Sequence, residues 1–216
     1  MNLDGSISLL IACMELVFII NLLIFAQKNS VNKMLIGQLA LLFGYQFLEF
    51  LICFMGIQKQ IVIYFAFLDI TLLPPLGLYI ALKYTGKLQS YHKYIFIPAL
   101  FFILYYPFVL DQFKVTKCTV LYASYNYPLG EFYAVLYYLP IIAAMIIYNK
   151  NWGAEQDPHQ KGLTRLLFFG YIFTFIPSMI IAIFFLSFVY AVESLLCKMA
   201  FILATFSFIF VLKNRS

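Results

Sequence analysis

The chain has 216 residues, of which 64% are hydrophobic and 11% are charged, and its formal net charge is +5. Soluble domains are about 45–50% apolar and about 25% charged, so this composition excludes an ordinary soluble protein and indicates an integral membrane protein. The basic residues lie in short segments beside apolar runs, which is typical of membrane orientation and not of nucleic-acid binding. We therefore expect the lipid bilayer as a partner, and no nucleic acid.

Seven apolar runs follow one another along the chain. A helix needs about 20 residues, and at least about 17, to cross a hydrocarbon core about 30 Å thick. We predict an all-α bundle of seven transmembrane helices that forms a single domain over residues 1–216, with no soluble output domain. The predicted spans are residues 7–27, 34–57, 61–83, 94–110, 131–149, 164–186 and 191–212. The residues before the first span include Asp4 and no basic residue, which favours a retained helix over a cleavable signal peptide.

Basic residues are distributed unevenly between the two sets of loops. Ten lie after the first, third, fifth and seventh predicted spans, whereas three, Lys59, Lys114 and Lys117, lie on the other side. Because cytoplasmic loops carry the excess of Lys and Arg, the ten are assigned to the cytoplasm. The N-terminus is then predicted to lie outside the cell and the C-terminus in the cytoplasm.

The connections between the spans differ in character. The longest outer segment, residues 111–130, is rich in Tyr and alternates in polarity around residues 116–122. This pattern favours a short hairpin, or a lid over the outer face. The inner segment 149–162 is polar and contains the single Trp, Trp152, and we interpret it as a solvated connection.

Four cysteines are present, without a CxxC spacing. Cys13, Cys53 and Cys197 lie in apolar runs, and Cys118 lies in the outer segment. We expect small buried apolar side chains, which is how unpaired cysteines usually behave. A bridge from Cys118 to Cys53, or to another cysteine near the same surface, stays open as an alternative.

Four ionisable side chains lie well inside the apolar runs. With a rise of 1.5 Å per residue, Glu15, Glu49 and Asp69 lie about 12 Å from the outer ends of their helices, and Lys198 lies about 10 Å from its own. Four groups from four helices thus fall at one level of the outer half of the membrane. Charged groups in hydrocarbon need partners or water, so we expect these side chains to converge.

The charges of this layer do not balance, because three acids face one base. We expect Lys198 to pair with Asp69 or Glu49, and the remaining acids to share a proton or to meet a cationic ligand. Polar residues at helical spacing widen the predicted pocket. The candidate ligand-binding residues are Glu15, Gln46, Glu49, Asp69, Tyr137, Ser178 and Lys198, with Glu193 at the pocket mouth. Alternatively, buried ion pairs of this kind only fix helix packing.

Sequence signals for catalysis and for cofactors are missing. The two histidines, His92 and His159, lie outside the apolar runs, and there is no HExxH, GxSxG or P-loop pattern. We therefore expect no enzyme activity, no catalytic residue and no metal site. A lysine in the seventh span near acids invites comparison with retinal proteins, but the residues around Lys198 lack the motif of microbial rhodopsins. Trp152 lies outside the predicted spans, so we expect no retinal and no other cofactor.

The segment LLPPLGLYIALKYTG, residues 72–86, resembles the third-helix region of the seven-helix sensory modules at the N-terminus of some bacterial histidine kinases. The chain departs from them in lacking the kinase that follows. It is also similar to small stand-alone bacterial seven-helix proteins of unknown function, through Gln46 to Glu49, the Pro-containing third span and Cys197 to Ala200. The resemblances imply a multi-pass protein of the bacterial inner membrane, and they name no ligand.

Three functions remain as hypotheses. The first is a receptor-like sensor that binds a small cationic or amphipathic molecule in the outer pocket and is read by a separate cytoplasmic signalling partner. The second is a small proton-coupled transporter in which the carboxylates form the relay. The third is a structural membrane subunit without a ligand.

Overall fold

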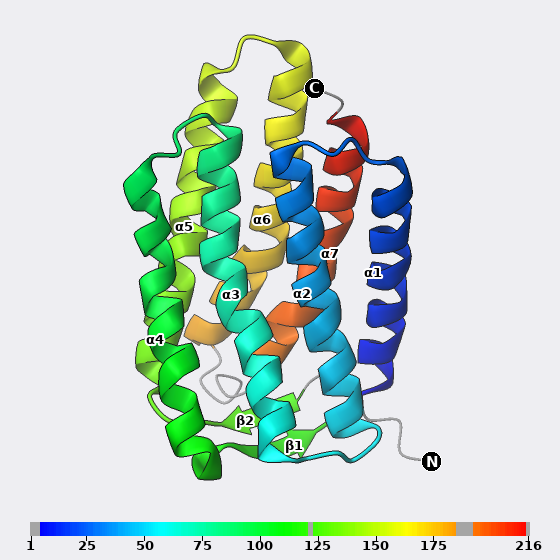
Figure 1. Ribbon diagram of the computed structural model, residues 1–216, viewed down its shortest axis with the longest axis vertical. Helices are drawn as coiled ribbons and strands as arrows, with labels where there is room; N and C mark the ends of the chain where they lie inside the picture. Colours follow the sequence, from blue (N-terminus) through cyan, green and yellow to red (C-terminus); the bar gives the residue numbers. More distant parts are fainter. Residues whose placement is uncertain (1–4, 121–122, 185–191, 215–216) are drawn as a thin grey trace.

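The computed structural model describes residues 5–120, 123–184 and 192–214, and it is a helical bundle with a small β-hairpin at one end (Figure 1). Among these residues, seven helical segments are long and apolar enough to cross a membrane. The fold therefore supports a multi-pass membrane protein. The elements are α1 (Ser6–Phe25), α2 (Ser30–Cys53), α3 (Gln60–Tyr84), α4 (Ile97–Tyr105), β1 (Lys114–Cys118), β2 (Ala123–Asn126), α5 (Gly130–Ala154), α6 (Pro158–Phe184) and α7 (Val192–Lys213).

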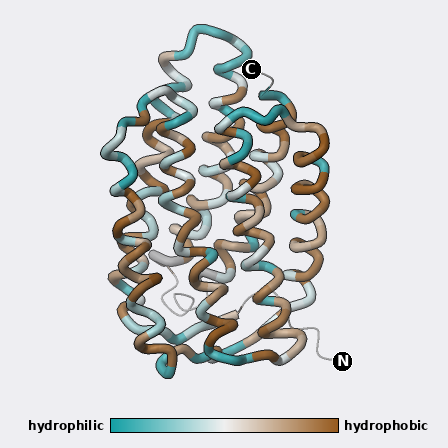
Figure 2. The backbone as a smooth tube through the Cα atoms, in the orientation of Figure 1, coloured by the Kyte–Doolittle hydropathy of each residue, from teal (hydrophilic) through white to brown (hydrophobic). Residues whose placement is uncertain are grey.

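The helix ends are set by local polar residues. The Asn29 side chain accepts a hydrogen bond from the Asn32 amide and caps α2, and the Asp157 side chain caps α6 through the amides of residues 159 and 160. Gly86, at φ +70°, ends α3 in a Schellman motif, in which the Lys87 amide donates to the Leu82 carbonyl. Figure 2 shows the result, with hydrophilic turns at the two ends and hydrophobic helices between them.

The packing order puts α2, α3 and α7 in the middle of the bundle. Helix α2 packs against α1, α3 and α7, helix α3 packs against α5, and α6 lies between α5 and α7. Helix α1 begins at the end that carries the hairpin, and α7 finishes at the opposite end (Figure 1). One face of α1 is exposed from Leu9 to Phe25, so this helix meets the bundle along a single stripe.

The fourth span differs from the single helix predicted over residues 94–110. It consists of a 3₁₀ helix (Ser90–Phe96), the nine-residue α4 and a second 3₁₀ helix (Tyr106–Gln112). Pro98 and Pro107 each occupy the start of one of these segments. Proline is favoured in a first helical turn but lacks the amide that a continuous helix needs, so the span is segmented and lies at the edge of the bundle against α3.

The inner segment 149–162 is mostly exposed, as expected of a solvated connection, and none of its residues is buried. Its backbone is more helical than predicted. Helix α5 continues to Ala154 and α6 begins at Pro158, because Pro158 at the first helical position follows the capping Asp157. Trp152 consequently lies in α5, where its ring is 5.6 Å from that of Phe168 in α6.

The outer segment forms the hairpin that its alternation predicted. Strands β1 and β2 are antiparallel, with Val115 opposite Tyr125. A disulfide joins Cys118 of β1 to Cys53 at the end of α2, with a Cα–Cα distance of 5.6 Å. The interpretation of these two cysteines as small apolar side chains was therefore wrong, and the alternative bridge is the one present. The Gly5 amide also donates to the Thr119 carbonyl, at 3.1 Å.

Aromatic rings fasten the hairpin to the bundle. The ring of Phe67 in α3 lies 5.2 Å from Phe113, 5.5 Å from Tyr125 and 4.5 Å from Tyr127, in edge-on geometries. Such arrangements are favoured by the ring quadrupoles. The hairpin is thus held by a covalent bond to α2 and by ring packing on α3.

The disulfide can be tested by counting reactive thiols. We predict that the denatured, unreduced chain reacts with an alkylating reagent at two cysteines, Cys13 and Cys197, which are not disulfide-bonded, and at all four after reduction. Intact-mass spectrometry measures the number of adducts. In a Cys118→Ser variant, Cys53 should become a third reactive thiol. Four adducts on the unreduced wild-type chain would contradict the bridge.

Candidate functional site

A buried ion pair forms the centre of the candidate site. The Lys198 ammonium on α7 donates to Glu49 Oε1 on α2 at 2.5 Å and to Gln46 Oε1 at 2.9 Å. The side chains of Lys198 and Glu49 are 9% and 1% exposed. Gln46 also donates from Nε2 to the Cys197 carbonyl, at 2.7 Å, so its amide uses its acceptor and one donor to join α2 to α7.

Two serines complete the hydrogen bonding of the Glu49 carboxylate. Ser8 of α1 donates to Oε1 at 3.0 Å, and Ser194 of α7 donates to Oε2 at 2.8 Å. The Ser194 hydroxyl in turn accepts from the backbone amide of Ala123 in β2, at 2.9 Å. We call Ser8, Gln46, Glu49, Ser194 and Lys198 the outer cluster, because it lies at the hairpin end of the bundle and joins α1, α2, α7 and β2.

Helical spacing explains why these residues meet. Gln46 and Glu49 are three residues apart on α2, and Ser194 and Lys198 are four apart on α7, so each pair occupies one face of its helix. The facing stripes of α2 and α7 are in contact. The remaining donor, Ser8, lies on the buried stripe of α1.

Glu15 lies close to the outer cluster without being bonded to it. It is fully buried, two turns along α1 from Ser8 on the same stripe, and neither carboxyl oxygen has a hydrogen-bond partner among the described residues. Lys198 is near enough to act on it electrostatically. The structure therefore brings together Glu15, Gln46, Glu49 and Lys198. Of the two acids predicted as partners of Lys198, Glu49 is the one that forms the ion pair.

Asp69 does not join them, which corrects one part of the expected layer. Its carboxylate is half-buried on α3 and lies over the backbone of Gly44 on α2. No hydrogen bond or ion pair forms with it in the described part of the chain. Glu49 lies about 140° around α2 from Gly44 at 100° per residue, so Asp69 and the outer cluster lie on different sides of this helix.

The other predicted pocket residues are distributed more widely. Tyr137 lines two small cavities, and no residue of the outer cluster is among the residues that line them. Ser178 is buried and donates to the Phe175 carbonyl of its own helix at 2.8 Å, which is the usual local bond of a helical serine, so it does not need a ligand. The side chain of Glu193, the predicted mouth residue, lies outside the described part of the structure.

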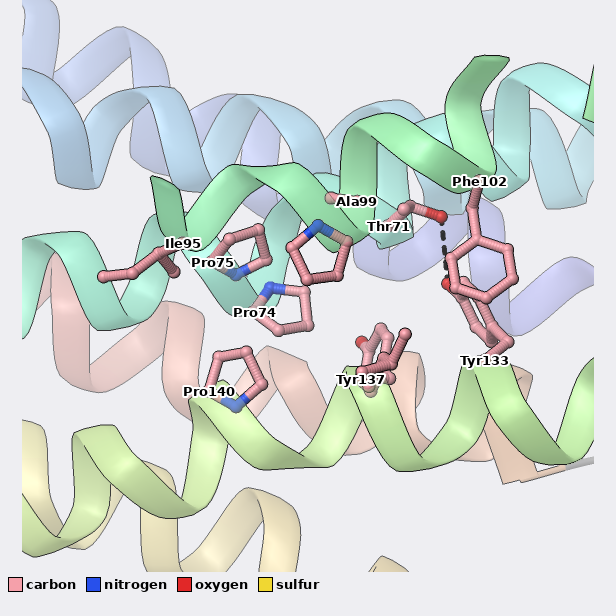
Figure 3. Close-up of a pocket in the computed structure, with 11 residues that line it drawn as sticks. Thr71, Pro74, Pro75, Ile95, Ala99, Phe102, Tyr133, Tyr137 and Pro140 are labelled. Atoms are coloured by element: carbon pink, nitrogen blue, oxygen red, sulfur yellow. Dashed lines mark hydrogen bonds between the residues drawn. The ribbon is translucent and has the colours of Figure 1, made fainter. Parts of the chain in front are cut away.

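Two cavities are described in the bundle. The first lies between α3, α4 and α5, where Pro74 and Pro75 face Pro140 and Tyr137 across the space (Figure 3). The second lies among α2, α3, α5, α6 and α7. Each has a volume of about 20 Å³, which holds about one water molecule. Drug-sized ligands need several hundred Å³, so neither cavity accepts one without rearrangement.

Two members of the outer cluster, Ser8 and Ser194, were not among the predicted site residues, and neither was the Ala123 amide that donates to Ser194. Both serines have a sequence signal, because Ser8 is seven residues from Glu15 and Ser194 is four residues from Lys198, which places each on the same helix face as that charged residue. Ala123 contributes only a backbone amide, for which no side-chain pattern exists.

These features define the class of the protein, a seven-helix multi-pass membrane protein with a buried polar cluster at the hairpin end. No protein-family model matches the chain, and no curated protein or solved structure matches it either. The resemblance of residues 72–86 to sensory modules accordingly stays a prediction.

Removing one partner of the ion pair should destabilise the bundle strongly. Lys198→Met leaves the Glu49 carboxylate buried without its cation, and such a loss typically costs about 3–5 kcal/mol. We expect the thermal midpoint in detergent to fall for Lys198→Met, and to recover in the double variant Lys198→Met with Glu49→Gln, since the uncompensated charge is gone. Lys213→Met, at the exposed end of the same helix, is the control. Losses that simply add, within about 0.5 kcal/mol, would contradict the pairing.

Proposed function

We propose that this chain is a receptor-like sensor of the cell membrane, which binds a small cationic or amphipathic molecule at the outer cluster. In this proposal the hairpin end faces the exterior and α7 ends in the cytoplasm. The excess of basic residues at the other end supports that orientation, and so does the Cys53–Cys118 disulfide at the hairpin, because disulfides persist in oxidising compartments. The resemblance of the third span favours the inner membrane of a bacterium.

Glu15 is the observation that carries the proposal. It is a fully buried carboxyl without a hydrogen-bond donor among the described residues, and the neighbouring base is already bonded to Glu49 and Gln46. Two acids and one lysine leave the region one positive charge short. A buried carboxylate is stabilised by a cation or by hydrogen bonds, and a ligand ammonium would supply both.

The hydrogen-bond chain offers a route from the exterior to α7. It runs from the Ala123 amide through Ser194 to Glu49 and Lys198. At the far end of the same two helices, Asn214 donates to Asn32 Oδ1 at 2.9 Å, and Asn32 donates to the Asn214 carbonyl at 3.2 Å. Helices α2 and α7 are thus hydrogen-bonded near both ends. In this proposal, a ligand that changes the contacts of the outer cluster also changes the position of α7 relative to α2 at the end where Asn32 and Asn214 are bonded.

Ligand entry requires movement in this proposal. The described cavities hold about one water each, and the hairpin amide closes on Ser194. A molecule reaching Glu15 must separate contacts between α1, α7 and the hairpin. A cytoplasmic partner could then read the change beside the basic inner loops.

The test uses n-octylammonium as the probe, with n-octanol as a neutral molecule of the same length. We expect octylammonium to raise the thermal midpoint of the wild-type protein in detergent, because a ligand at 100 times its Kd stabilises the folded state by about 2.7 kcal/mol. Glu15→Gln should abolish this shift, since the amide offers no charge. Glu131→Gln, an exposed acid in the first turn of α5, should keep it. An equal shift with octanol, or in Glu15→Gln, would exclude the proposed site.

A proton-coupled transporter is the second candidate, and Glu15 favours it as well, because a proton can fill the same charge deficit. A relay through Glu15 and Lys198 predicts proton flux across liposomes containing the protein, measured with a pH-sensitive dye under an imposed potential. Glu15→Gln should reduce that flux at least about tenfold, and Glu131→Gln should not. Flux that survives Glu15→Gln unchanged would remove this candidate, and a protein that neither transports nor binds would be left as a structural subunit.

A further inference from the structure

The carboxylate of Asp69 lies on the outer surface of the bundle, between α2 and α3. It is half-buried and rests against Gly44, where a Cβ on α2 would collide with it. In the described part of the chain no hydrogen bond or ion pair satisfies it. The embedded lysine, Lys198, is occupied by Glu49 and Gln46 in the interior. Asp69 therefore has no partner among the residues that the structure describes.

The depth of Asp69 makes that position costly. It is nine residues from Gln60, the first residue of α3, which corresponds to about 13 Å along the helix. A carboxylate at that level in hydrocarbon needs a proton, water or a cation. With the first residue of α3 taken as the bilayer surface, the lipid headgroups lie about 13 Å from this carboxyl group. A transmembrane helix of another chain can place a fixed cation at this level.

The surface around Asp69 is suited to a neighbouring helix. The residues of α2 that face outward here are small, namely Gly37, Ala40 and Gly44, and a Cβ on Gly37 would meet no atom within 4 Å. Small residues let two helix backbones approach closely in a membrane. Phe47 and Phe65, which are 41% and 48% exposed, stand at the hairpin end of the same surface. The face therefore combines a strip of small residues, an aromatic border and one carboxyl group without a partner in the described part of the chain.

We propose that this α2–α3 face binds a transmembrane helix of another protein that carries a lysine or arginine at the level of Asp69. Charge complementarity selects this occupant. A second copy of the chain offers no such cation from its described spans, because its Lys198 is buried in its own ion pair. The inference does not depend on a ligand at Glu15, since Asp69 and the outer cluster lie on different sides of α2.

The experiment uses a model transmembrane peptide as the probe. A Leu-Ala helix of about 23 residues, with one arginine nine residues from its outer end, is compared with the same peptide carrying methionine. The full-length protein is reconstituted in phosphatidylcholine vesicles, and association is measured by energy transfer between dyes on peptide and protein. We expect the arginine peptide to bind at least tenfold more tightly than the methionine peptide.

Variants separate the charge from the shape of the face. Asp69→Asn keeps the size of the side chain and should lower binding of the arginine peptide at least tenfold. Gly37→Leu places a bulky side chain on the strip of small residues without touching the interior. It should lower the binding of the arginine and methionine peptides alike. Glu131→Gln, an exposed acid on α5, should change nothing, and unchanged thermal midpoints show that the variants fold.

Three results would overturn the inference. The first is equal affinity of the arginine and methionine peptides for the wild-type protein. The second is binding that survives Asp69→Asn. The third is energy transfer between two copies of the chain that depends on Asp69, since that would assign the face to self-association.

Discussion

The ion pair between Lys198 and Glu49 is the constraint on which the outer half of this bundle depends. A charge in a low-dielectric interior is tolerated only when its partner and its remaining hydrogen bonds are in place. Here the requirement is met by groups from α1, α2, α7 and the hairpin. Four segments that are distant in sequence must therefore reach their final positions together.

The same constraint makes Glu15 unusual, because it is a buried acid for which the requirement is not met among the described residues. The donors near the ion pair are directed at Glu49, which leaves the second buried acid with the electrostatic interaction of Lys198 and without a hydrogen bond among the described residues. Were the region purely structural, a hydrophobic side chain at position 15 would pack as well and avoid the cost of burying a carboxyl group. A buried acid at this position is consistent with the proposed site for a proton or a cation.

The spans were readable from the sequence, whereas the meeting of the four charged groups was readable only in part. The seven spans follow from apolar run lengths, and Glu15, Glu49 and Lys198 lie near one another. Asp69 instead lies against Gly44, five residues or about 7.5 Å along α2 from Glu49. The azimuth of each side chain does not follow from the sequence, because in a membrane helix the lipid-facing and core-facing sides are both apolar and the hydrophobic pattern has little periodicity. Asp69 and Glu49 thus looked equivalent in the sequence, although Glu49 points to the interior of the bundle and Asp69 lies on its surface. The predicted end of α5 and the predicted start of α6 were wrong for a related reason. A polar stretch such as the one around Trp152 can remain helical beyond the apolar part of a span.

The disulfide between Cys53 and Cys118 closes a loop with a sequence separation of 65 residues that contains the third and fourth spans. It can form only after the segment that follows the fourth span has come to lie beside the end of α2. The covalent link at the hairpin end therefore depends on thiol oxidation after these segments have come together. A cell that fails to oxidise the pair would still build the helices, but it would release the hairpin from its covalent link to α2.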